Sequence, residues 1–162
     1  MIILGIDPGI ARVGWAVLTA GHGNPQAVSY GCITTMKEET PERRLATIHE
    51  KIEKLCKKYK PDTVSVEEIF FSTNVKTAIH VGQARGIVLL TAAQSNIPVV
   101  SYTPSTVKLT ICGSGSAGKD QVQKMVTRIL KLKTIPTPDD TADAIAIALT
   151  HAYSYRLNRA LI

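Results

Sequence analysis

Cysteine is scarce in this sequence, and no stretch of it is hydrophobic for long enough to cross a bilayer. The three cysteines are odd in number and widely separated, which argues against a disulfide framework and against a cysteine-based zinc site. The first residues, MIILGI, are apolar, but Asp7 interrupts them and no basic leader or cleavage site accompanies them. We therefore expect a strand here rather than a signal peptide, and a cytoplasmic protein with no membrane segment.

Low-complexity runs and internal repeats are also absent, so neither a disordered tail nor a fibrous protein is indicated. The chain instead has 44% hydrophobic and 20% charged residues over 162 positions, which is the composition of a folded, soluble protein. That length is enough for one domain with a genuine core and too short for two ordinary ones. We expect a single domain over residues 1–162.

The hydrophobic patterns predict a sheet covered by helices. Two apolar runs, 1–7 and 12–20, flank a turn-forming PGI sequence and predict a hairpin, and a third strand is expected near 26–36. The other predicted elements are, in chain order, a helix over 41–60 with Thr40 as N-cap, a strand over 62–70, a helix over 74–95, a strand over 97–102, two short helices around the glycine loop 113–118, and a helix over 139–155. Hairpins first and helical connections later predict a mixed five-stranded sheet flanked by helices, an α/β domain.

Most of the net charge of +6 is concentrated in one window. Residues 104–133 hold six Lys and Arg residues against one acid, Asp120. Such a concentration is typical of a surface that binds a polyanion, because each neutralised phosphate releases condensed counterions. A solvated helix face has the same composition, and the charge alone leaves both interpretations open.

Acidic residues stand at several positions where acids are costly. Asp7 closes one apolar strand, Glu67 interrupts another, and Asp140 and Asp143 open a helix of Ala and Ile. Each position also has a purely structural explanation: a turn residue, an exposed strand end or a favourable first helical turn. Together, however, strand ends and a helix start can bring several carboxylates to a common edge, where divalent cations relieve their repulsion. The four histidines lack ligand spacing, so triads and zinc sites receive little support.

The stretch GSGSAGKD, residues 113–120, imitates a phosphate-binding P-loop in all but its last letter. A true P-loop follows a buried strand and ends in a Ser or Thr that binds magnesium. Here the preceding PSTVKLTIC reads as a helix, and Asp120 would repel phosphate. Nucleotide binding is therefore the weaker interpretation of this loop.

Five motifs in unbroken order give the sequence its resemblance to a known family. LGIDPGIARVGWAV, VSVEEIFFSTN, VGQARG, GSGSAGKDQVQKMV and DDTADAIAIA resemble the successive motifs of RuvC, the bacterial Holliday junction resolvases. The resemblance implies a ribonuclease H-like fold, a homodimer, and nicking of four-way DNA junctions with two magnesium or manganese ions per site. It places the metal ligands at Asp7, Glu67, Asp140 and Asp143. Glu68 and Asp139 are then neighbours rather than ligands.

The same resemblance assigns further residues to DNA. It makes Lys108 and Lys119 the basic residues beside the active site, with Lys119 supporting cleavage, and it places Arg85 of VGQARG among the DNA-binding residues. Phe70 matches an aromatic residue that stacks on an unpaired base, whereas Phe71 is expected in the core. The family also implies a partnership with the branch-migration proteins RuvA and RuvB.

Other functions stay open at this point. An ATPase of the actin and sugar-kinase group also carries an Asp-x-Gly signature in its first hairpin, but it would need a second domain and further glycine-rich motifs. A junction-binding protein without catalysis is a further alternative, but the presence of acids at all four predicted ligand positions argues against it. Gly82 and Gly86, four apart in the predicted helix, indicate close packing against either a partner helix or a neighbouring element of the same chain.

Overall fold

A computed structural model of the chain describes residues 1–21, 23–68 and 75–160. Its strands are β1 (Ile2–Asp7), β2 (Arg12–Thr19), β3 (Gln26–Thr34), β4 (Thr63–Glu67) and β5 (Val99–Tyr102). Its helices are α1 (Pro41–Tyr59), α2 (Val75–Gln94), α3 (Pro104–Cys112), α4 (Lys119–Ile129) and α5 (Asp139–Ala160). The predicted elements are thus confirmed in kind and order.

The five strands form one mixed sheet in the order β3-β2-β1-β4-β5. The hairpin partners β1 and β2 pair antiparallel, as do β2 and β3, whereas β4 and β5 join through parallel pairing. Two predicted ends change: β4 is described only to Glu67, and α5 continues beyond residue 155 to Ala160. Thr40 precedes α1 as predicted, although its side chain makes no capping hydrogen bond.

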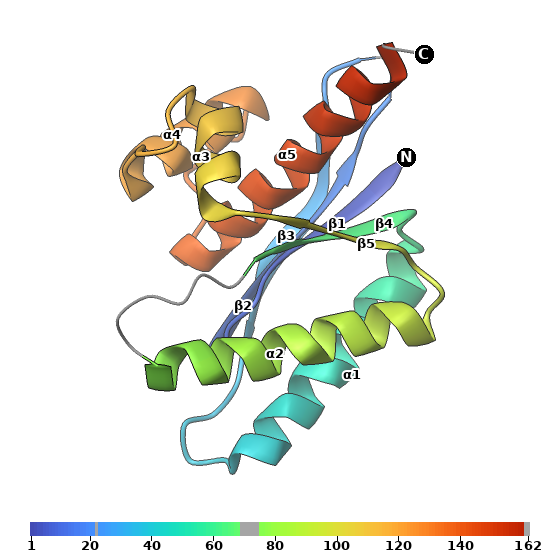
Figure 1. Cartoon of the computed structure of the whole chain (residues 1–162), viewed down its shortest axis with the longest axis vertical. Coiled ribbons are helices and arrows are strands. Elements are labelled where there is room, and N and C mark those ends of the chain that lie inside the picture. Colours follow the sequence, from blue (N-terminus) through green and yellow to red (C-terminus); the bar gives the residue numbers. More distant parts are fainter. Residues whose placement is uncertain (22, 69–74, 161–162) are drawn as a thin grey trace.

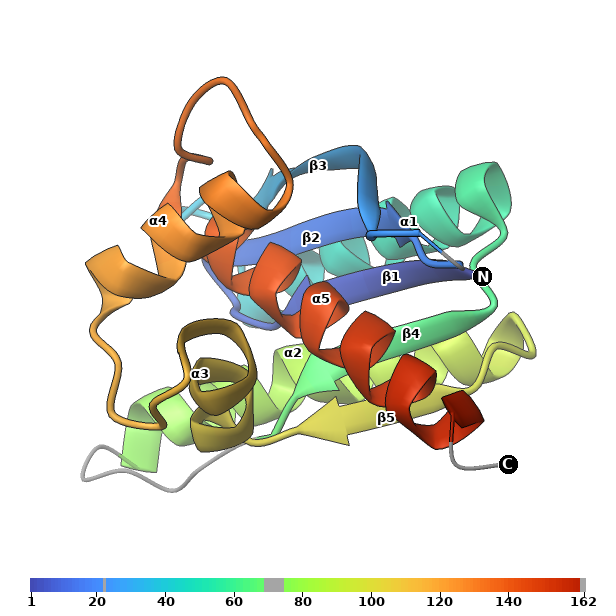
Figure 2. The same cartoon turned by 90° about the horizontal axis from the view of Figure 1, so that it is seen from above.

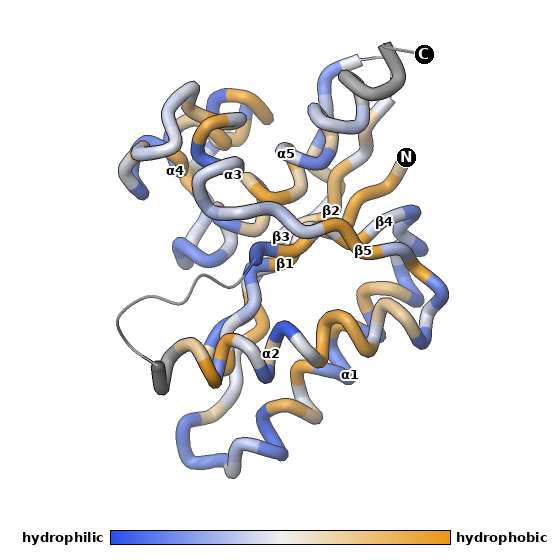
Figure 3. Tube along the Cα trace, in the orientation of Figure 1, coloured by the Kyte–Doolittle hydropathy of each residue, from blue (hydrophilic) through white to orange (hydrophobic). Residues whose placement is uncertain are grey.

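Helices cover both faces of the sheet. Figure 1 shows α1 and α2 on one side and α3, α4 and α5 on the other, and Figure 2 shows α5 lying across the strands. Alternation along β1 explains this arrangement, because Ile3 belongs to the core under α5 while Leu4 and Ile6 belong to the core over α1 and α2. Hydrophobic residues accordingly concentrate along the central strands, and the connection from β3 to α1 is hydrophilic (Figure 3).

The helix α5 contacts all five strands and is the central element of its layer. Its residues from Ala144 to Ala152 are buried, which explains why this helix is apolar on all sides rather than amphipathic. Glycines let it approach the sheet closely: a side-chain carbon at Gly5 would overlap the carbonyl oxygen of Ala144, and one at Gly14 would overlap that of Asp140. The first turn of α5 is therefore fixed against the start of the hairpin.

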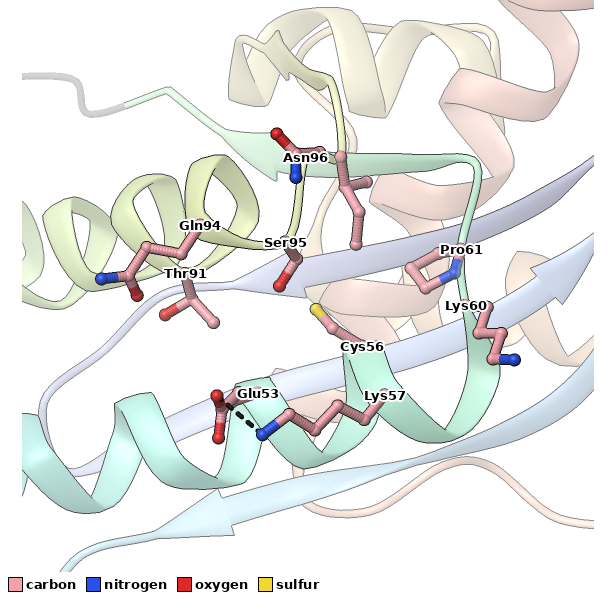
Figure 4. A pocket seen from close by; sticks show the side chains of 10 residues that line it. Glu53, Cys56, Lys57, Lys60, Pro61, Thr91, Gln94, Ser95 and Asn96 are labelled. Atoms are coloured by element: carbon pink, nitrogen blue, oxygen red, sulfur yellow. Dashed lines mark ion pairs between the residues drawn. The ribbon is translucent and has the colours of Figure 1, made fainter.

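A cavity of about 460 Å³ lies between the C-terminal ends of α1 and α2 (Figure 4). Cys56 of α1 and Ser95, just after α2, both line it, and burial raises the pKa of the Cys56 thiol. Glu53 and Lys57 form an ion pair of 2.8 Å at its edge. None of the predicted site residues lines this cavity. In the described part of the chain, no helix is long and apolar enough to span a membrane.

Candidate active site

The two strand carboxylates lie side by side at one edge of the sheet. Asp7 is the last residue of β1, and Glu67 is the last residue of β4. These strands run parallel, with Ile6 opposite Val66, so their carboxyl ends meet at the same edge. The register thus places the predicted pair together, although the two acids are far apart in the sequence.

The helix α5 brings the other acids to this edge. Asp139 and Asp140 stand in its first turn, and Asp143 follows on the next. The close contact at Gly14, which pairs with Asp7 in the hairpin, fixes that first turn beside the strand ends. The helix includes both Asp139 and Asp140, so these two acids lie in its favourable first turn.

The charges in this cluster act on one another. Burial raises the pKa of Asp7 well above its usual range, and the charges of Glu67, Asp143 and Asp140 raise it further. The pKa of Glu67 rises to about 7, mainly through burial and then through the charge of Asp143. Burial likewise raises the pKa of Asp143. The four predicted ligands therefore form one electrostatic cluster, as the repulsion argument from the sequence requires.

Lys119, the first residue of α4, is turned toward this cluster. Its Nζ lies 2.5 Å from Asp139 and 3.4 Å from Asp143. The contact with Asp139 is the main cause that raises the pKa of Lys119, and it also lowers the pKa of Asp139. Lys108 of α3 lies close enough to counteract the rise in the pKa of Glu67. Of the two predicted basic residues, Lys119 thus contacts the acids, and Lys108 acts on Glu67 through its charge.

The glycine loop before Lys119 does not have the context of a P-loop. The helix α3 precedes it, as predicted, and Gly113 ends that helix in the left-handed conformation with φ of 76°. Asp120 belongs to the first turn of α4. The loop therefore connects two helices and delivers Lys119 to the carboxylates.

Arg12 is a site residue that sequence reasoning did not single out. Its Nε lies 3.1 Å from Oδ2 of Asp140, and its Nη2 lies 3.8 Å from Oδ1 of Asp139. The available signal was its place in the first motif: Arg12 opens the second strand of a hairpin whose first strand ends at Asp7. A residue at that place lies near the same sheet edge.

The aspartates of the cluster form ion pairs with basic side chains of the same chain. Lys119 and Arg12 pair with three of the aspartates, Asp139, Asp140 and Asp143. Within the described ranges, no three His, Cys, Asp or Glu side chains are arranged so that they could hold a metal ion. The chemistry of the cluster nevertheless fits a divalent cation, since several hard oxygen donors gather there with raised pKa values.

Arg85 takes a position that was not predicted. It lies on α2, and its guanidinium donates from Nε to the carbonyl oxygen of Glu67 at 3.2 Å and from Nη2 to Oγ of Ser101 at 2.8 Å. These bonds tie the ends of β4 and β5 together behind the site. Phe70, the predicted stacking residue, and Phe71 lie outside the described residues.

The order of this mixed five-stranded sheet and its similarity to a solved resolvase define the ribonuclease H-like class of nucleases, and the acidic cluster lies at the ends of two of its strands. The family model described as crossover junction endodeoxyribonuclease RuvC matches residues 3–151. The chain therefore belongs to the RuvC family.

Individual relatives resemble the chain over nearly its whole length. The crossover junction endodeoxyribonuclease RuvC of Moorella thermoacetica is 51% identical over 152 residues, which cover 94% of this chain and 91% of that protein. The structure of Thermus thermophilus RuvC is similar with a TM-score of 0.89 and 38% identity, covering 98% of this chain and 97% of its own. T. thermophilus RuvC in complex with a Holliday junction substrate gives a TM-score of 0.88 at 35% identity, covering 97% and 96%. The predicted ribonuclease H-like fold is confirmed.

Proposed function

We propose that this protein is a structure-selective endonuclease that resolves four-way DNA junctions by cutting two strands at symmetric positions. Hydrolysis at each position would leave a 5′-phosphate and a 3′-hydroxyl, ends that a ligase can rejoin. The observation that carries the proposal is the cluster of Asp7, Glu67, Asp140 and Asp143 beside lysines, in a chain of the RuvC family. A relative solved with a Holliday junction substrate supports the choice of substrate.

Two divalent ions, magnesium or manganese, are the proposed cofactor. These metals prefer carboxylate oxygens, and Asp7, Glu67, Asp140 and Asp143 would hold them. The raised pKa values of Asp7 and Glu67 support this assignment, because a bound cation would relieve the repulsion that contributes to them. When bound, such ions activate water and neutralise the charge that develops on the phosphate.

The lysines would hold the DNA strand at this edge. We assign Lys119 a catalytic role because its ammonium group reaches two carboxylates of the site and would meet the phosphate on which negative charge develops. Lys108, which acts on the charge of Glu67, would bind the neighbouring backbone. The concentration of positive charge in residues 104–133 supports a polyanion at this surface.

Two further DNA contacts belong to the proposal. Phe70 would stack on an unpaired base near the centre of the junction, a contact worth about 1–3 kcal/mol in comparable cases. The predicted DNA contact of Arg85 also stays a prediction. Two of its donors are already bound to the strand ends, which supports a positioning role through the backbone of Glu67.

A homodimer would provide the second active site. A four-way junction and a two-fold dimer have matching symmetry, so two sites can cut paired strands. We place the interface on the outer face of α2, which consists of Ile79, Gly82, Gly86, Leu90 and Ala93. Ile79 and Leu90 are 55% and 51% exposed, and a side-chain carbon on Gly86 would meet no atom within 4 Å. Packing inside the chain therefore does not explain Gly86.

The proposed setting is the cytoplasm, where the protein would act as a single domain. Hydrophobic clusters on both faces of one sheet support the single domain. The branch-migration proteins RuvA and RuvB stay the proposed partners, as the resemblance of the sequence motifs implies.

The test is cleavage of a labelled synthetic four-way junction, with magnesium and then with chelator. Symmetric nicks that require the metal are expected. Glu67→Gln should abolish cleavage while junction binding persists, whereas the matched control Glu50→Gln, in an exposed ion pair on α1, should cleave normally. Full cleavage by Glu67→Gln would exclude the carboxylate mechanism. ATP hydrolysis without nicking would instead favour the kinase-like alternative.

A further inference from the structure

Arg12 stands at the edge of the acidic cluster opposite Lys119. The two cations contact different oxygens of Asp139: Arg12 lies near Oδ1 at 3.8 Å, and Lys119 lies near Oδ2 at 2.5 Å. Arg12 also pairs with Asp140, and Lys119 also pairs with Asp143. The proposed ligands on α5 are thus each neutralised by a side-chain cation.

The pairing of Arg12 is of a kind that breaks easily. The side chain of Arg12 is 48% exposed and that of Asp140 is 21% exposed, so the pair is open to solvent on the arginine side. Solvent-accessible ion pairs are typically worth only about 0–1 kcal/mol. Among the described residues, Oδ2 of Asp140 has no hydrogen-bond partner although Nε of Arg12 lies 3.1 Å away. The contact is therefore a charge pair without hydrogen-bond geometry, and a divalent cation at Asp140 would displace it.

Once displaced, the guanidinium would lie beside the DNA strand. Arg12 opens β2 at the sheet edge where β1 and β4 end, and about half of its side chain is accessible to solvent there. A guanidinium presents a planar set of donors that matches phosphate oxygens in a bidentate manner. The backbone of the DNA strand at this edge offers such oxygens.

We propose that Arg12 changes partner when the site is loaded: it pairs with Asp140 in the metal-free protein and binds a DNA phosphate when a divalent cation takes Asp140. This inference rests on the proposed function, because it requires DNA and metal at the same edge. It makes Arg12 a DNA-binding residue only in the metal-loaded protein. Metal binding and backbone binding are then coupled through one side chain.

The salt dependence of junction binding tests this exchange. Anisotropy of a labelled junction is measured over a series of salt concentrations, once with chelator and once with calcium, and gels verify that the junction stays intact. Log affinity falls as log salt concentration rises, and each phosphate contact makes this slope steeper by about 0.9. With chelator, Arg12→Ala should have the slope of the wild type. With calcium, its slope should be smaller by about 0.9.

Two further arms separate this idea from simpler effects. Arg43→Ala, which removes an exposed arginine from α1, should change the slope equally in both conditions or leave it unchanged. In a calcium titration without DNA, Arg12→Ala should bind calcium up to about fivefold more tightly than the wild type. The reason is that a competing charge pair worth about 0–1 kcal/mol is removed. Circular dichroism checks that each variant is folded. Arg12→Gln repeats the test with an uncharged side chain that is longer than alanine.

The outcomes distinguish the two proposals. A wild-type protein that neither binds nor cuts the junction would overturn the proposed function. A wild-type protein that cuts, with an Arg12→Ala slope reduced equally in chelator and calcium, would make Arg12 an ordinary phosphate contact and overturn the exchange. An unchanged slope in calcium would overturn it as well.

Discussion

Replacing Gly14 by alanine tests whether the close contact between β2 and α5 sets the geometry of the site. The added carbon would overlap the carbonyl oxygen and carbon of Asp140, both backbone atoms that cannot rotate away. Either β2 or the first turn of α5 must then move, and overpacking of this kind costs about 1–3 kcal/mol of stability. The acids of α5 would move with their helix, and a misplacement of about 1 Å can cost about 100-fold in rate.

The assay combines thermal unfolding with single-turnover cleavage of a four-way junction at saturating magnesium. Gly14→Ala should lose stability and cleave about 100-fold more slowly even where it is fully folded. Gly21→Ala is the matched control, because a side-chain carbon there meets no atom within 4 Å. Wild-type melting and cleavage by Gly14→Ala would refute the contact and the reasoning built on it.

Three more results are expected. Arg85→Ala should lower stability by about 1.5–3 kcal/mol in chemical denaturation and slow cleavage, and Arg85→Lys should not restore either, because an ammonium cannot bridge the carbonyl of Glu67 and Ser101 in the same way. The folded-state pKa of Glu67 lies above its usual range, so the metal-free protein should lose stability as pH rises toward and through about 7, and Glu67→Gln should flatten this dependence in pH-dependent melts. Ile79→Glu combined with Leu90→Glu should give a folded monomer in analytical ultracentrifugation, and a dimer that persists would move the interface away from α2.

Much of the fold was predictable because local patterns and tertiary packing agree. Continuous apolar runs form strands that are buried on both faces, and the apolar residues that recur every three or four positions in 41–60 lie on one face of α1. The clustering of the four acids was predictable for a similar reason, since acids that end strands or open an apolar helix are costly unless they lie together. Asp7, Glu67, Asp140 and Asp143 do interact electrostatically.

The side-chain partnerships could not be predicted in the same way. Nothing in the local pattern distinguishes Arg12 from any exposed residue at the start of a strand, and its role depends on the angle at which α5 crosses the sheet. Asp139 seemed a bystander by resemblance, yet it holds the shorter contact to Lys119. The position of Arg85 depends on long-range register between α2, β4 and β5, which no sequence period encodes.

The helix α2 has 20 residues and is roughly 30 Å long, and its two sides differ in their contacts. One side presents Ile79 and Leu90 to solvent, and the other holds the strand ends through Arg85. A shift of α2 would therefore act on the backbone of Glu67 through the hydrogen bond from Arg85. Under the proposed dimer, the second copy would cover the outer face of α2 and restrain its movement, so dilution to monomers would loosen the position of Glu67.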